Sequence, residues 1–247
     1  MIYFKNVNKA FQTQVVLNNL NLHVKKGEIT VIMGPSGVGK SVSLKLLMGL
    51  MKPDSGEIIL DGQNVCELSD EEMKKIRKKI GMLFQDAALF DYLNVYENVS
   101  FPMLEHTKLS EEKIKVHVEE KLSEVGLTDI NEKLPSELSG GMRKRVGLAR
   151  ALMLNPKVIL FDEPTTGLDP ITTSQIGDLI LKTQRSRNAT VLLINHDLAL
   201  TYKVADKVAM LYNGEIVEYC TPKELKKSEH PFVKNFLEAH INMENYK

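Results

Sequence analysis

The architecture of this chain is set by one stretch, Glu28-Ile-Thr-Val-Ile-Met-Gly-Pro-Ser-Gly-Val-Gly-Lys-Ser41. Its apolar run, Ile29 to Met33, is typical of a buried strand, and the helical pattern Val42 to Leu50 follows it. Between the two, residues 34–41 match the spacing G-x-x-x-x-G-K-S at every fixed position. A strand, a glycine-rich turn and a helix in this order predict a loop whose backbone N–H groups surround a phosphate.

Glycines suit such a loop because its backbone must curl around the phosphate with no Cβ in the way. We expect Lys40 to reach the β- and γ-phosphates of a nucleoside triphosphate, and the hydroxyl group of Ser41 to bind Mg²⁺. The agreement across the whole motif argues against an ordinary turn with incidental glycines. The predicted nucleotide-binding residues are Gly34, Pro35, Ser36, Gly37, Val38, Gly39, Lys40, Ser41 and Val42.

Length and composition narrow the class of protein. With 247 residues, the chain can form one large domain or two small ones around a real core. Its 32 basic and 32 acidic side chains give no overall positive field, so nothing argues for nucleic acid as a partner. The basic run 74–79 reads first as a solvated helix face and second as a contact site. Two cysteines, Cys66 and Cys220, make no disulfide framework and indicate a reducing compartment.

The sequence also lacks targeting and membrane signals. No basic region followed by an apolar stretch opens it, and no run approaches the roughly 18 apolar residues of a membrane span. We therefore expect a soluble, cytoplasmic protein without a signal peptide, whose role at a membrane depends on a partner.

Strand-like and helical segments alternate along the chain, which predicts an α/β fold with a mostly parallel sheet. A split at residues 9–13 separates the first two strands, and Asn213-Gly214 predicts a hairpin between the last two. Residues 86–154 carry helices and loops without a convincing strand, and we expect a helical subdomain there. Strands are expected at 2–7, 15–24, 56–60, 80–84, 158–161, 190–194, 208–212 and 215–219, and helices at 69–79, 111–125 and within 137–154.

Acidic and polar side chains follow three of the predicted strands. Asp162 and Glu163 come after the apolar run 158–161, where the end of a buried strand would adjoin a phosphate site. We expect Asp162 to hold Mg²⁺ and Glu163 to orient or deprotonate an attacking water. Gln85 is expected to reach Mg²⁺ or that water, and His196 the γ-phosphate. Gln85 is unremarkable by itself. A histidine in the place of His196 is, by itself, more often a structural hydrogen-bond partner.

A second glycine turn, Leu138-Ser-Gly-Gly-Met142, opens a helix that we expect to run from Met142 to Leu154. It adds another helix N-terminus that can bind an anion. One copy has no use for two such ends on the same phosphate. Two copies arranged head to tail do, because each would offer its Ser139 turn to the ATP held by the other. A plain helix cap explains Ser139 but not the paired glycines.

Taken together, these motifs resemble those of ATP-binding cassette (ABC) transporter ATPases, over essentially the whole chain. The set comprises the phosphate loop, the turn 138–142, the acidic motif 158–163, the loop Gly167-Leu-Asp169, His196 and Gln85. The resemblance implies that Phe11 stacks on adenine, although by itself Phe11 reads as an ordinary exposed residue. It also implies that ATP is contacted by Ser139, Gly140, Gly141, Met142 and Asp169, and Mg²⁺ by Ser41, Gln85 and Asp162.

The same resemblance implies a P-loop NTPase fold, in which a RecA-like parallel sheet core carries an antiparallel β subdomain and an inserted α-helical subdomain. We accordingly expect a single ABC ATPase domain over residues 1–247. Its core and β subdomain would take 1–85 and 156–220, its helical subdomain 86–155, and a C-terminal helical tail 221–247.

Within that family, the chain resembles the Mla type, the ATPase of lipid-transport systems that have an MCE-domain partner. The resemblance rests on 88–90, 94–95, Phe101 to Thr107, Met142 and Asp169 to Thr172. The chain departs from the common pattern at Asn195, where Ser or Thr is more frequent, and at Asp91-Tyr92, which replaces a proline. We expect the first to leave hydrolysis intact, while the second touches the groove for the membrane partner.

The resemblance implies a homodimer that closes on two ATP molecules, works with membrane permease subunits and lies on the cytoplasmic face of the inner membrane. An MCE-domain protein and a small regulatory subunit are further expected partners. The main alternative is the ATPase of an importer for a small polar solute such as an amino acid. A soluble cassette acting on ribosomes or DNA lacks support here, because the chain has neither a second cassette nor a long coiled coil. A nucleotide sensor without turnover is disfavoured by the intact Asp162-Glu163 pair.

Overall fold

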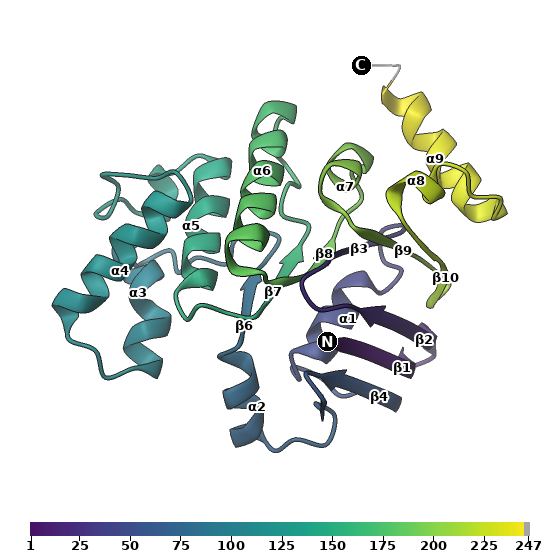
Figure 1. The fold of residues 1–247 in the computed structure, drawn as a ribbon, viewed down its shortest axis with the longest axis horizontal. Coiled ribbons are helices and arrows are strands. Elements are labelled where there is room, and N and C mark those ends of the chain that lie inside the picture. The colour runs from purple at the N-terminus through teal and green to yellow at the C-terminus, as the bar shows by residue number, and fades with distance from the viewer. Residues whose placement is uncertain (245–247) are drawn as a thin grey trace. The chain divides into compact units, whose positions relative to one another are not determined.

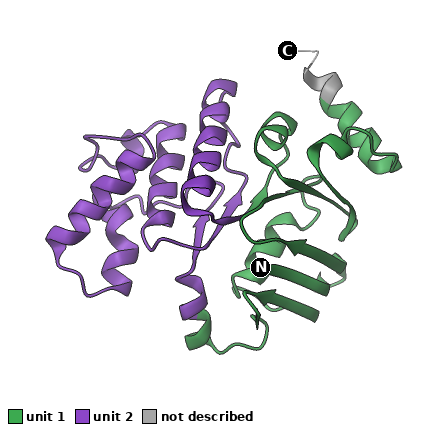
Figure 2. Cartoon of the chain, in the orientation of Figure 1, with its two compact units in different colours: residues 1–73, 192–247 green, residues 74–191 purple. Residues whose placement is uncertain are grey.

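The computed structural model describes residues 1–244, so the last three residues of the predicted helical tail, 245–247, lie outside the described residues. The chain divides into two compact units, one formed by residues 1–73 and 192–247 and the other by residues 74–191 (Figure 2). Helix α2 (Asp70–Arg77) and strand β8 (Thr190–Ile194) each run from one unit into the other. Each unit is described by itself below.

The first unit contains an antiparallel sheet in the order β2-β1-β4-β5. Its strands are β1 (Ile2–Phe11), β2 (Gln14–Val24), β4 (Ser55–Leu60) and β5 (Gln63–Asn64). The predicted break at residues 9–13 is wrong in its extent, because β1 continues to Phe11, paired with Gln14. Only Gln12 and Thr13 form the turn, and Gln12 takes a left-handed φ of 55°. Cross-strand pairing with β2 holds the polar residues of this segment in the sheet.

The phosphate-loop segment follows a strand of the second sheet. The strands of this sheet that belong to the first unit follow the order β10-β9-β3-β8 (Figure 1). Strand β3 (Ile29–Met33) is buried along its whole length and pairs in parallel with β9 (Lys207–Tyr212). Beyond the turn at Asn213 and Gly214, β10 (Glu215–Cys220) returns antiparallel to β9, as the hairpin signal predicts. The helices of this unit are α1 (Lys40–Leu47), α7 (Leu198–Val204), α8 (Pro222–Leu225) and α9 (Pro231–Glu244).

The second unit is built on the parallel pair β6 (Ile80–Leu83) and β7 (Val158–Asp162), in which Leu83 lies opposite Phe161. Helix α5 (Gly140–Leu152) packs closely on β6, so that a Cβ added to Gly81 would lie 2.5 Å from the carbonyl oxygen of Ala151. The helices of this unit are α3 (Val95–His106), α4 (Glu111–Glu124), α5 (Gly140–Leu152) and α6 (Pro170–Arg187), with a 3₁₀ turn at Pro135–Glu137.

The predicted α/β class is confirmed, since each unit combines parallel strands with helices. Helices α3, α4 and α5 all lie within the predicted helical segment 86–155, although the compact unit that holds them also includes β6, β7 and α6. Helix α5 begins at Gly140, two residues before the predicted start at Met142. Among residues 1–244, no helix combines the length and apolarity needed to cross a membrane.

Candidate functional site

The loop between β3 and α1 has three glycines, each in a backbone conformation that favours glycine. Gly34, Gly37 and Gly39 take φ values of 152°, 79° and 104°. A Cβ on Gly34 would lie 2.2 Å from the carbonyl oxygen of Leu211, and one on Gly39 would lie 2.7 Å from Val16 Cγ1. At Gly37, by contrast, a Cβ would meet no atom within 4 Å of the described structure, so only the backbone conformation calls for glycine there.

Lys40, the first residue of α1, folds back into this loop. Its ammonium group donates hydrogen bonds to the carbonyl oxygens of Gly34 (2.9 Å) and Pro35 (2.8 Å) and is nearly buried. The hydroxyl group of Ser43 donates to the carbonyl oxygen of Lys40 at 2.6 Å. A positive charge thus lies inside a turn of the type that binds anions, at the N-terminus of a helix.

A cleft of about 590 Å³ opens beside the loop in the first unit. Pro35, Ser36, Gly37 and Val38 form one side of it. The remaining walls come from β2 and from the β9–β10 hairpin: Gln14, Val15, Val16, Asn18, Tyr212, Asn213 and Gly214. The sequence showed Tyr212 only as a strand end and Asn213-Gly214 only as a hairpin turn, but their position at the end of a parallel strand was a usable signal, because ligands bind at the carboxyl ends of such strands.

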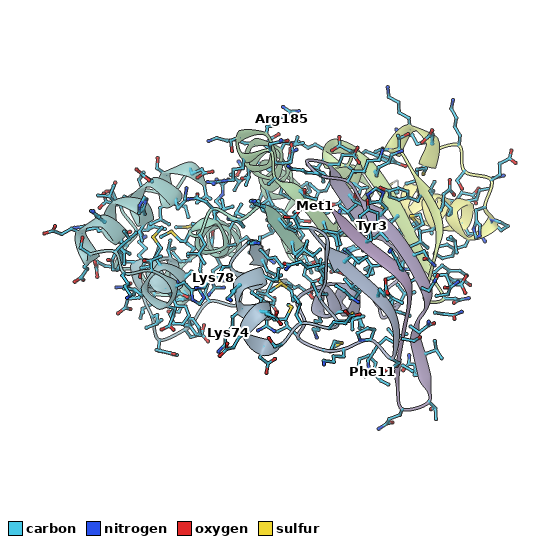
Figure 3. All side chains as sticks on the ribbon, turned by 60° about the horizontal axis from the view of Figure 1, so that its bottom comes forward. Met1, Tyr3, Phe11, Lys74, Lys78 and Arg185 are labelled. Carbon is cyan, nitrogen blue, oxygen red and sulfur yellow. The ribbon has the colours of Figure 1, made fainter. Side chains whose placement is uncertain are left out.

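Phe11, the predicted adenine-stacking residue, lies at the end of β1 and pairs with Gln14, which lines the cleft. Its ring is 44% exposed, and the ammonium group of Lys9 lies 5.5 Å from the ring centroid. Figure 3 shows Phe11 near the tip of the β1–β2 hairpin. Phe11 is therefore partly exposed and pairs with a residue of the cleft wall, although it is not itself one of the residues that line the cleft.

In the second unit, the acidic motif ends β7. Asp162 is the last residue of the strand, and Glu163 takes a left-handed φ of 46°. This conformation costs a residue other than glycine about 1–2 kcal/mol. The hydroxyl group of Thr166 donates a 2.9 Å hydrogen bond to Glu163 Oε2. A strained and side-chain-bonded carboxylate at a strand end is the kind of arrangement found at functional sites.

Gln85 follows the neighbouring strand β6, so it and the acidic motif lie at the same edge of the β6–β7 pair. Its side chain is exposed. In the first unit, His196 is also exposed and follows β8, whose end adjoins β3 through a hydrogen bond from Asn195 N–H to Ile32 O (3.2 Å). The unusual Asn195 is buried and donates to the carbonyl oxygen of Asp197 at 2.7 Å, which explains why an amide can stand here.

The second glycine turn and the loop before α6 lie together within the second unit. Ser139 caps α5 by accepting a hydrogen bond from Met142 N–H at 3.3 Å. A Cβ on Gly141 would lie 2.7 Å from Thr172 Cγ2, which gives this glycine a packing role. Asp169 caps α6, accepting from Ile171 N–H and Thr172 N–H at 2.9 Å. The Thr172 hydroxyl group lowers the pKa of Asp169 by hydrogen bonding to its carboxylate.

Sequence reasoning missed the network that shapes the segment after Gln85. Ala87 and Ala88 have φ values of 61° and 46°, and Arg150 of α5 donates to their carbonyl oxygens at 2.6 and 2.8 Å. Buried Asn98 donates to the carbonyl oxygen of Leu93 at 2.9 Å and accepts from Phe90 N–H at 2.9 Å. These bonds stabilise a strained turn, and two of its residues are alanines, which gave no sequence signal.

Comparison with known proteins gives concordant matches. The family model described as ABC transporter matches residues 17–166. The chain is 43% identical over 236 residues to the probable ribonucleotide transport ATP-binding protein mkl of Mycobacterium leprae, covering 96% of this chain and 68% of that protein. It is likewise 43% identical over 239 residues to the intermembrane phospholipid transport system ATP-binding protein MlaF of Haemophilus influenzae, covering 97% and 90%. The MlaF protein of Escherichia coli K12 is 38% identical, with 97% and 89% covered.

Solved structures match equally well. The ATP-binding cassette MJ0796, determined as a dimer in a post-hydrolysis state bound to ADP and Pi, superposes with a TM-score of 0.83 at 35% identity, covering 90% of this chain and 99% of that one. The cbiO1 protein of Clostridium perfringens, part of the ABC transporter complex cbiONQ, has a TM-score of 0.84 at 33% identity, covering 92% and 91%.

Proposed function

Because the chain belongs to the ABC transporter family, we propose that this ATPase powers the movement of phospholipids between membranes. ATP is its substrate, and its fold is that of the P-loop cassettes. The observation that carries the hydrolytic part of the proposal is the adjacent pair Asp162 and Glu163 at the end of β7, with Glu163 held by Thr166. A binding module without turnover has no need of that second carboxylate.

In the proposed mechanism, the N–H groups of the phosphate loop and the ammonium group of Lys40 bind the phosphates. Glu163 orients the attacking water and accepts its proton, and His196 contacts the γ-phosphate. Charge that develops on the phosphoryl oxygens is stabilised by Lys40 and by N–H groups at the start of α5, the signature helix, which begins at the signature turn 138–142. Phe11 stacks on the adenine base.

Mg²⁺ fits the residues available in this chain. Ser41, Gln85 and Asp162 offer a hydroxyl, an amide carbonyl and a carboxylate, and hard oxygen donors of this kind suit Mg²⁺. When bound with ATP, Mg²⁺ neutralises charge on the phosphate oxygens.

The signature helix is proposed to act on the ATP of a second copy. Within one chain, two helix N-termini are suited to anions, one at Gly39 and one at Ser139. Each copy of a closed homodimer would then present Ser139, Gly140, Gly141, Met142 and Asp169 to the nucleotide bound by its partner. The determination of MJ0796 as a dimer supports this arrangement.

The phospholipid assignment rests on how much of each relative the chain spans. It covers 90% of the phospholipid-transport relative of H. influenzae but 68% of the equally identical ribonucleotide-transport relative. We accordingly propose permease subunits, an MCE-domain protein and a small regulatory subunit as partners, on the cytoplasmic face of the inner membrane. An importer ATPase for a small polar solute is the second candidate.

Two experiments test these proposals. Phosphate release from ATP by the purified protein tests turnover, and loss of release in Ser139→Arg, with ATP binding retained, tests the contribution of the second copy. Mixed in equal amounts with a Lys40→Met copy, the same variant should regain about a quarter of the wild-type activity only if sites form between chains, because about half of the dimers are then mixed and each mixed dimer holds one complete site. Co-purification from membranes tests the cargo class: an MCE-domain protein supports phospholipid transport, whereas a periplasmic solute receptor supports the importer.

A further inference from the structure

Helix α5 carries a buried lysine that the proposed mechanism does not use. Lys144 is 5% exposed, and its Nζ atom has no hydrogen-bond partner among the described residues. Burial of an ammonium group without a hydrogen bond is costly. Burial accordingly lowers the pKa of Lys144, against the opposing attraction of Asp86, Glu163 and Asp162. A lysine in this position does not serve stability.

The location of Lys144 follows from the face of α5 to which it belongs. Gly147 and Arg150 succeed it at intervals of one helical turn, and both contact the segment after Gln85. A Cβ on Gly147 would lie 3.0 Å from Ala87 Cβ, and Arg150 donates to the carbonyl oxygen of Ala87. In the other direction, Ser139 lies little more than one turn away, at the N-terminus of α5. Lys144 therefore lies between the signature turn and the segment that begins with Asp86.

Three carboxylates of the same unit act electrostatically on Lys144. Asp86 follows Gln85, and Asp162 and Glu163 end the neighbouring strand β7. All three attract the ammonium group of Lys144, whereas Arg143 repels it. Lys144 is thus a buried cation that the acidic residues after β6 and at the end of β7 attract without accepting a hydrogen bond from it.

We propose that Lys144 is a positioning residue for ATP hydrolysis, whose buried ammonium group attracts the carboxylates of Glu163 and Asp86 and so couples the signature turn to the acidic motif of the same copy. This inference rests on the proposed function, since it assigns Glu163 to the attacking water. It adds a connection within one chain, between the signature turn and Glu163, to the proposed contact of Ser139 with the ATP of the second copy. When Ser139 contacts the ATP of the second copy, a movement of α5 also moves the ammonium group of Lys144 and so changes its attraction for Glu163.

The test compares Lys144→Met and Lys144→Arg with the wild-type full-length protein. Methionine has a similar length but no charge, and arginine keeps the charge. Lys78→Met is the matched control, because Lys78 is an exposed lysine of the same unit (Figure 3). For Lys144→Met we expect kcat for phosphate release to fall roughly 10- to 100-fold, with KM for ATP changed less than about twofold. Its Tm should stay level or rise, because a buried charge is removed.

Lys144→Arg should keep most of the turnover, and Lys78→Met should match the wild type in both measurements. The proposal is overturned if Lys144→Met retains wild-type kcat, if its kcat and Tm fall together, or if Lys144→Arg is as slow as Lys144→Met. The first result would exclude a role of Lys144 in hydrolysis. The second would leave Lys144 only a structural role. The third would show that the charge of the side chain does not determine the turnover. Absence of phosphate release from the wild type would instead contradict the proposed function.

Discussion

The side chain of Lys40 closes the phosphate loop on itself, because Nζ donates a 2.9 Å hydrogen bond to the carbonyl oxygen of Gly34 at the loop's first position. The same group bonds to Pro35 O at 2.8 Å. The charge that would bind the β- and γ-phosphates is therefore held inside the loop by neutral carbonyl groups. ATP phosphates would compete for it as better acceptors, since their oxygens carry a negative charge that attracts the ammonium group and carbonyl oxygens do not.

Lys40→Met should accordingly lose ATP affinity by roughly 100-fold or more, because both the charge and the donor disappear while the chain length remains. Binding of a fluorescent ATP analogue measures this loss. Lys45→Met is the matched control, since Lys45 is an exposed lysine of the same helix. Comparable losses in the two variants would show that only net charge matters.

The three glycines of the loop should not tolerate alanine equally. Gly34→Ala places a Cβ 2.2 Å from the main-chain oxygen of Leu211, which belongs to a neighbouring strand and has little room to move. Gly37→Ala meets no atom within 4 Å in the described structure and suffers only from its positive φ. We expect Gly37→Ala to lower the free energy of unfolding by about 1 kcal/mol, and Gly34→Ala by about 3 kcal/mol or more. Urea unfolding measures both, and equal losses would contradict this account of the loop.

Glu163→Gln should retain ATP binding and nearly abolish phosphate release. The amide keeps the size of the side chain and can still accept from Thr166, but it cannot take a proton from water. ATP-dependent dimerisation by size-exclusion chromatography should persist, because the closed dimer no longer opens. Thr166→Val is a companion variant that leaves the carboxylate but removes its 2.9 Å hydrogen bond, so we expect a smaller loss, of roughly tenfold. Wild-type hydrolysis by Glu163→Gln would remove this residue from its proposed role.

Features that depend on neighbouring residues in the chain could be predicted from the sequence. The strand, turn and helix around Gly34, the hairpin at Asn213-Gly214 and the cap at Ser139 all follow from local steric and hydrogen-bonding preferences. Features that depend on contacts between residues far apart in the chain could not be predicted from the sequence. Strand β1 reaches Phe11 because β2 pairs with it, and polar residues in that segment gave no strand signal.

The candidate site likewise contains some residues that the sequence could predict and others that it could not. Its motif residues were named from spacing, but the roles of Lys144, Arg150 and Tyr212 depend on which surface each one meets. Lys144 and Arg150 are basic residues of α5 to which the sequence assigned no role, yet Lys144 is buried and Arg150 stabilises a strained turn. Only the packing of α5 on β6 distinguishes these two from the exposed Arg143.

The ion pair formed by Glu124 and Arg187 should make the free energy of unfolding depend on pH in the acidic range. Arg187 at the end of α6 donates to both carboxylate oxygens of Glu124 at the end of α4, at 2.8 and 2.6 Å. Burial acts to raise the pKa of Glu124, but the hydrogen bond and charge of Arg187, with help from Lys121, lower it overall. A carboxyl group whose pKa is lowered by folding stabilises the native state above its unfolded pKa, and this contribution disappears as the pH falls through the folded pKa.

Arg187→Met should therefore lower the free energy of unfolding by about 1 kcal/mol at neutral pH, a value that allows for the partial exposure of the pair. Below an unfolded pKa of about 4.3 the difference from the wild type should shrink, because protonated Glu124 no longer binds the guanidinium group as an ion. Urea unfolding of both proteins between neutral and acidic pH measures this convergence. Arg185→Met serves as the control, since Arg185 lies on the same helix but is exposed (Figure 3). A constant difference across the whole pH range would mean that Arg187 stabilises the unit through its packing and its bond to Asn155, and not through its charge.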